Sequence, residues 1–127
     1  MGSVGAAEAP WQAALESARA NIRQAERSLE ASRRRRAGPA ERERHRRQAS
    51  AHLDVAAWHM QRAAAAGASV DEIQRGTGWP DRAAVAAVLR EGDSLRLAAG
   101  HDLPDVGSWR DGRFVGPEWP GSGTYPS

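Results

Sequence analysis

The sequence predicts an all-α protein, a long antiparallel helical hairpin followed by shorter helices and an irregular C-terminal tail. The 127-residue chain contains 26 Ala, 18 Arg and no Lys. Ala, Arg, Leu and Glu favour helices, and the β-branched residues that favour strands are few. Two stretches carry apolar residues at alternating spacings of four and three, which is the heptad pattern of packed helices. Breaks at Gly and Pro separate the periodic segments.

The first helix is expected to begin at Pro10 and to run to about Arg36, after a flexible N-terminus over residues 1–9. Pro suits the first turn, because its missing N–H has no helical partner there. The apolar seam of this helix is spaced 4-3-4-3-4, and its small Ala residues allow a partner helix to approach closely. We expect the seam to mediate homodimerisation. Its residues are Trp11, Leu15, Ala18, Ile22, Ala25 and Leu29.

A second helix is expected from about Ala40 to Ala66, because Gly38-Pro39 ends the first pattern. Helices joined by so short a connection are antiparallel neighbours, so residues 10–66 are predicted to form a coiled-coil-like hairpin. The seam of the second helix is Ala49, Leu53, Ala56, Met60 and Ala63.

Basic charge is concentrated where the two helices meet their connection. Residues 1–47 carry 11 Arg against 6 acidic residues, residues 48–90 carry 4 against 4, and residues 91–127 carry 3 against 6. Four consecutive Arg would cover all sides of a helix, and each Arg can bind a phosphate with two hydrogen bonds. We expect this Arg-rich tip (residues 33–47) to contact the phosphate backbone of DNA or RNA; the alternative is a solvated charged face. The candidate residues are Arg33, Arg34, Arg35, Arg36, Arg42, Arg44, Arg46 and Arg47.

Residues 67–92 contain the most specific pattern of the chain. The run Ser69-Val70-Asp71-Glu72 has the form of a capping box and begins a short helix. Gly78 allows the backbone to reverse, and a further helix is expected over 81–90, with Val85, Val88 and Leu89 on one face.

The stretch 68–90 resembles the bacterial helix-turn-helix DNA-binding family. The resemblance implies that the second helix of the unit enters a major groove. It also implies that Asp81, Arg82, Ala83 and Ala86 face the groove and that Arg90 points toward the phosphates. The alternative is a packing unit that contacts no nucleic acid.

Residues 93–127 are predicted to form an irregular tail, with one turn of helix over 94–99. Four of the seven aromatic residues of the chain lie in this tail, which is unusual for a disordered segment. The tail is therefore expected to dock, either on the protein's own core or on a protein partner. Residues 109–114 predict a small hairpin through their Asp-Gly turn.

No catalytic or metal chemistry is visible. The chain has no Cys, and His45, His52 and His59 are seven residues apart, roughly 10 Å along a helix, too far to share a metal ion. They are expected to form a solvated or partner-facing stripe. We expect no cofactor, no metal, no membrane span and no enzymatic activity, in a cytoplasmic protein.

The function favoured by these patterns is non-enzymatic DNA binding, as a small transcriptional regulator or a phage- or plasmid-type accessory factor. The alternative is a structural protein–protein interaction module, in which the hairpin assembles with other copies and the aromatic tail docks a partner.

Overall fold

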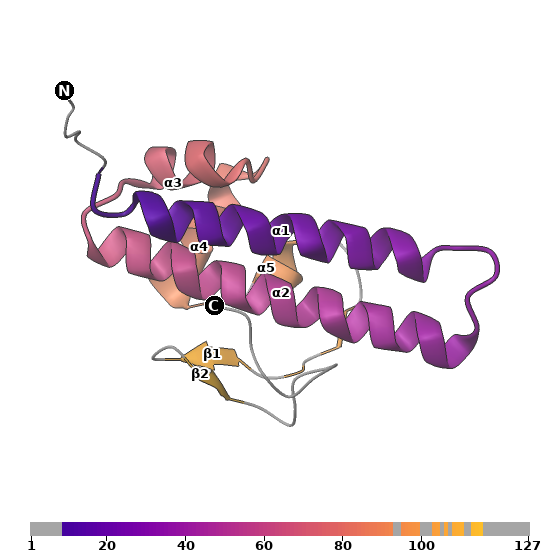
Figure 1. Cartoon of the computed structure of the whole chain (residues 1–127). Coiled ribbons are helices and arrows are strands. Elements are labelled where there is room, and N and C mark those ends of the chain that lie inside the picture. The colour runs from indigo at the N-terminus through magenta and orange to yellow at the C-terminus, as the bar shows by residue number, and fades with distance from the viewer. Residues whose placement is uncertain are drawn as a thin grey trace.

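The computed structural model describes residues 9–92, 95–99, 103, 104, 106, 108–110 and 113–115. Its elements confirm the all-α fold class, with one short strand hairpin near the C-terminus. Helices α1 and α2 lie side by side and run in opposite directions (Figure 1). The elements are α1 (Gln12–Ser32), α2 (Pro39–Ala65), α3 (Val70–Thr77), α4 (Arg82–Glu91), α5 (Leu95–Ala98), β1 (Ser108–Arg110) and β2 (Arg113–Val115).

The contact between α1 and α2 is lined by small side chains. Five alanines in it are at most 1% exposed, which allows the two backbones to approach closely. Larger apolar residues from both helices fill the space between these alanines. The alanines are Ala18 and Ala25 of α1 and Ala49, Ala56 and Ala63 of α2.

The α1 seam that was expected to form a dimer is occupied within the chain. Leu15, Ala18, Ile22 and Ala25 are buried in the core that α1 shares with α2 and the shorter helices. Trp11 and Leu29 pack at the edge of the same core. The buried part of the seam is covered by α2 and α3 of the same chain. The dimerisation role predicted for Leu15, Ala18, Ile22 and Ala25 is therefore corrected to an intramolecular one, and for the half-buried Trp11 and Leu29 it stays a prediction.

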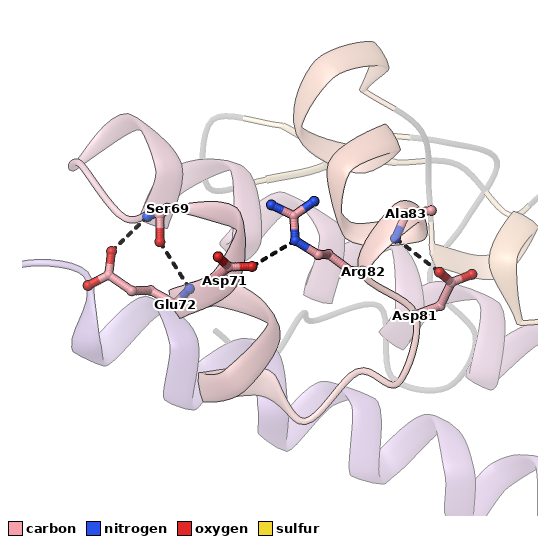
Figure 2. Close-up of polar contacts among 6 residues, drawn as sticks. All are labelled: Ser69, Asp71, Glu72, Asp81, Arg82 and Ala83. Carbon is pink, nitrogen blue, oxygen red and sulfur yellow. Dashed lines mark hydrogen bonds and ion pairs between the residues drawn. The ribbon is translucent and has the colours of Figure 1, made fainter.

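Two short helices pack against the α1–α2 pair and are defined by their ends. Ser69 caps α3: its Oγ accepts the Glu72 N–H at 3.1 Å, and its own N–H donates to Glu72 Oε1 at 2.8 Å (Figure 2). The predicted capping box is therefore confirmed. Gly78 ends α3 and Gly92 ends α4, each with a positive φ that favours glycine.

Helix α2 is also covered by the last part of the chain that the structure describes. Two residues of α2, Ala51 and Val55, are fully buried. Val106, which lies just before β1, is fully buried as well. Strand β1 contacts α2, and Figure 1 shows the hairpin on the side of α2 away from α1. This part of the tail therefore docks on the protein itself. Trp119 and Tyr125, like residues 1–8, lie outside the described residues.

The small hairpin predicted over residues 109–114 is confirmed. Trp109 pairs with Phe114, and Arg110 pairs with Arg113 in antiparallel register. The two residues between the paired arginines are the Asp-Gly dipeptide that predicted this register.

A close approach at Gly76 fixes α3 against α1. A Cβ atom at this position would lie 2.6 Å from Leu15 Cδ1 and 3.3 Å from Leu15 Cβ. Because Leu15 is itself buried in the core, its side chain has little room to move away.

Gly76→Ala is therefore expected to lower the free energy of unfolding by about 1–3 kcal/mol through overpacking, despite the better helix propensity of Ala. Urea denaturation followed by circular dichroism measures this change. In a Leu15→Ala background, the second substitution should be close to neutral, because the clash is relieved. An equal loss in both backgrounds would contradict this account.

Candidate nucleic-acid interface

The four consecutive arginines lie in the connection between α1 and α2, not on a helix. Helix α1 ends at Ser32, whose Oγ donates to the Leu29 carbonyl at 2.6 Å. The Ala37 N–H then donates to the Arg34 carbonyl at 3.1 Å, which closes a turn. The expected end of α1 at Arg36 was thus four residues too far. Four adjacent guanidinium groups repel one another, and the connection lets them separate in a way that a continued helix would not.

The side chains of the Arg-rich tip are open to solvent. Arg33 to Arg36, Arg42 and Arg44 are exposed, and Arg46 and Arg47 are half-buried. Ala37, between the two groups, is buried. The connection is therefore anchored at Ala37, with the four arginines before it accessible.

Few carboxylates offset this charge. The tip has eight arginines and two glutamates, a formal charge of +6. Glu43 Oε1 lies 3.6 Å from Arg46 Nη1, and Glu41 Oε2 lies 3.8 Å from His45 Nε2. Among the described residues, six arginines of the tip have no carboxylate within 4.0 Å. They are Arg34, Arg35, Arg36, Arg42, Arg44 and Arg47.

The positive charge stops at the tip. The exposed surface of α1 carries three arginines and three glutamates, so its formal charge is zero. A polyanion would therefore meet strong positive potential at one end of the helix pair and a neutral surface along its length. The α1 residues are Glu16, Arg19, Arg23, Glu26, Arg27 and Glu30.

The arginines expected to contact DNA from α4 have acidic neighbours. Arg82 Nε donates to Asp71 Oδ1 at 2.7 Å, which joins the first turns of α4 and α3 (Figure 2). This hydrogen bond, together with the charge of Arg82, lowers the pKa of the exposed Asp71 carboxyl. Arg90 Nη2 lies 3.0 Å from Glu91 Oε1. Both arginines are exposed, yet neither is free of a local counter-ion.

The other residues expected to face the groove differ in their solvent exposure. Asp81 caps α4, since its Oδ1 accepts the Ala83 N–H at 3.0 Å (Figure 2). Asp81 and Ala83 are exposed, whereas Ala86 is half-buried. Val85 and Val88 are buried, as expected for the inward face of α4, and Leu89 is half-buried.

The structure separates the two groups of predicted phosphate contacts. The Arg-rich tip lies at one end of the α1–α2 pair, and α3 and α4 pack toward the other end (Figure 1). The candidate residues therefore do not form one site. Sequence reasoning missed Asp71 as the partner of Arg82, because the residues are 11 apart and lie on different helices, so no helical spacing links them.

Two of the three predicted stripe histidines face the inside of the molecule. His52 Nδ1 is 2.8 Å from Asn21 Oδ1 across the α1–α2 contact, and His59 is only 6% exposed. Burial lowers the pKa of His52 to about 4. Burial and the nearby charge of Arg62 lower the pKa of His59 to about 4. The expected solvated or partner-facing stripe is corrected, because the helix face that carries it is covered by α1.

Within the described part of the chain, no group of three or more potential metal ligands comes together, and no helix is both long and apolar enough to cross a bilayer. Comparisons with protein-family models, curated proteins and solved structures gave no match to this chain.

The lowered pKa values of His52 and His59 predict a stability that falls on mild acidification. An unfolded His titrates near pH 6.5, whereas His52 and His59 titrate near pH 4 in the folded chain. Between these values the unfolded chain binds more protons, so the free energy of unfolding decreases as the pH falls from about 6.5 to 4. Thermal unfolding across this range measures the effect. His59→Gln removes one titrating group and should reduce the slope by up to about 1.4 kcal/mol per pH unit; an unchanged slope would count against this interpretation.

Proposed function

We propose that this protein binds nucleic-acid phosphate through its Arg-rich tip and has no catalytic role. The observation that carries the proposal is the group of six arginines without a carboxylate within 4.0 Å in the described part of the chain. Guanidinium groups match phosphate oxygens with paired hydrogen bonds, and each phosphate that they neutralise releases condensed counterions. The tip therefore has the chemistry for sequence-independent binding to a polyanionic backbone.

The setting of the tip supports this proposal. The connection between the two helices is short, and the buried Ala37 anchors it. The backbone that carries Arg33 to Arg36 is therefore positioned before binding, which reduces the entropy lost when these arginines contact adjacent phosphates. The neutral surface of α1 restricts the contact to the tip.

Helices α3 and α4, which resemble a helix-turn-helix unit, are proposed to make a secondary contact with nucleic acid. Two short helices joined through Gly78 with inward aliphatic residues are compatible with such a unit. To contact DNA, however, Arg82 would have to leave Asp71, and the Asp71 and Asp81 carboxylates would repel phosphate. We therefore assign most of the affinity to the tip, in a small cytoplasmic regulator or DNA-associated accessory protein.

The alternative, an assembly module, has less support. The α1 seam that would join two copies packs on α2. The described part of the tail that would dock a partner contacts α2 as well. The α1 seam and the described part of the tail are thus engaged within the chain.

The first experiment compares two triple variants that remove the same charge. Arg34/Arg35/Arg36→Gln should weaken binding to a random-sequence duplex at least about tenfold near 50 mM salt. It should also reduce the slope of log K against log salt by about 2 to 3, the value for three lost phosphate contacts. Fluorescence anisotropy at salt concentrations from about 50 to 200 mM measures both.

The matched control, Arg19/Arg23/Arg27→Gln, removes three exposed charges from the balanced surface of α1. It should leave the salt slope close to that of the unmodified protein. Equal losses in the two variants would show that net charge, and not the tip, governs binding. Absence of binding at low salt would refute the proposal altogether.

A second experiment tests α4. Arg82/Arg90→Gln is expected to change the affinity less than about threefold, because both side chains already have acidic partners. Asp71→Asn, which frees Arg82 and removes a negative charge, should strengthen binding if α4 approaches the duplex. A loss from Arg82/Arg90→Gln as large as that from the tip variant would show that α4 is a principal contact.

A further inference from the structure

A second candidate site lies at the end of the α1–α2 pair opposite the Arg-rich tip. A pocket of about 200 Å³ opens there between the first turns of α1 and the last turns of α2. Its walls are mostly apolar, with three polar side chains among them. The apolar residues are Pro10, Trp11, Ala13, Ala14 and Ala66, and the polar residues are Ser17, His59 and Arg62.

His59 is the unusual member of this pocket. The residue is 6% exposed, and both ring nitrogens are buried without a hydrogen-bond partner. Its ring makes an edge contact with Trp58, with the centroids 4.9 Å apart, which fixes its position from the α2 side. A neutral imidazole has one donor and one acceptor. Buried polar atoms without partners are rare in folded proteins. Among the described residues, the ring nitrogens are therefore unused hydrogen-bonding groups beside the pocket.

The charge of the pocket indicates which ligand would fit. Of the residues that the structure describes, Arg62 is the only charged one that lines it, and no carboxylate does. The Arg62 guanidinium lies over the Trp58 ring, with Cζ 4.8 Å from the centroid, and the residue is exposed. A positive group at the mouth of an apolar pocket favours a small anion with an apolar body. Since a cavity of about 150 Å³ can hold benzene, this pocket has room for one aromatic ring and a carboxylate.

We propose that this pocket binds a small monocarboxylate with an aromatic or short aliphatic body. The carboxylate accepts hydrogen bonds from Arg62 and, once the His59 ring turns toward the pocket, from a ring N–H of His59. The apolar body packs against Trp11 and the neighbouring alanines. The site shares no residue with the tip and does not depend on nucleic-acid binding.

Protonation of His59 would be coupled to this binding. In the empty pocket, burial and the charge of Arg62 hold the pKa of His59 to about 4. Arg62 is the charged residue that faces His59 on α2, and α1 contributes Ser17 and alanines to the same pocket. A bound carboxylate counteracts the charge of Arg62 and favours the imidazolium form. Affinity should therefore increase as the pH falls from about 7.5 to about 6.

The experiment uses benzoate as the probe and benzamide as its uncharged control, with the full chain. Titration calorimetry and the His59 imidazole signals in proton–carbon NMR spectra should detect benzoate, more tightly near pH 6 than near pH 7.5. Benzamide should bind at least about tenfold more weakly, because it lacks the charge that Arg62 and His59 recognise.

Variants separate the two polar groups. Arg62→Gln should weaken benzoate binding about tenfold, whereas Arg62→Lys should retain most of it. His59→Gln should remove the pH dependence, because glutamine hydrogen-bonds but does not titrate. His45→Gln, on the same helix but at the tip, should bind benzoate like the unmodified protein. If His59→Gln does not fold, the two Arg62 variants still decide the outcome.

Four results would overturn the proposal. The first is benzoate binding that leaves the His59 signals unchanged, and the second is equal affinity for benzamide. The third is the absence of any heat or change in the NMR signals when benzoate is added, which would mean that water alone fills the pocket. Loss of benzoate binding in Arg34/Arg35/Arg36→Gln would also contradict it, since that variant alters only the tip.

Discussion

The close contact between α1 and α2 is the constraint on which the other parts of the structure depend. Five alanines at this contact let the helices approach, and the larger side chains Leu15, Ile22, Leu53 and Met60 fill the remaining space. Helix α2 then serves as the central element, because α3, α4, α5 and β1 all contact it as well. One consequence is that polar residues of α2 are buried. Asp54, with a side chain only 3% exposed, has its Oδ1 3.8 Å from Arg96 Nε of α5. The half-buried His52 contacts Asn21 of α1 through its Nδ1.

The same packing explains why the charge is divided between two regions. The shorter helices cover the half of the pair that is far from the connection, so the Arg-rich tip extends beyond them (Figure 1). At physiological ionic strength the screening length is about 8 Å, so charges on α4 contribute little to the potential at the tip. On α4, Arg82 and Arg90 have acidic neighbours instead of adding to a common basic surface. The potential that a polyanion encounters is therefore set by one short segment.

Local rules were sufficient for much of the fold. The spacing of apolar residues identified the buried faces of α1 and α2, Ser69 and Glu72 fixed the start of α3, and an Asp-Gly dipeptide gave the register of the strand hairpin. Features that depend on how helices meet were not predictable in this way. Periodicity shows that a face is buried but does not identify what buries it, so the α1 seam was assigned to a second copy. The spacing of His45, His52 and His59 gave their common face, but not its coverage by α1.

The two ends of the helix pair show how one scaffold produces opposite environments for cationic groups. At the tip, Arg33 to Arg36 lie in a connection over which no described element packs, so they remain hydrated and charged, and a phosphate can reach them without displacing the described part of the protein. At the other end, α1 covers His59, and Arg62 adds a positive charge beside it, so the imidazole remains neutral above about pH 4. A neutral, buried ring that lacks hydrogen-bond partners is sensitive to whatever enters the adjacent pocket, because an anion changes both its hydrogen bonding and its preferred charge. Since that pocket is formed by the helix pair itself, a ligand that binds only the folded form would stabilise the contact that presents the tip.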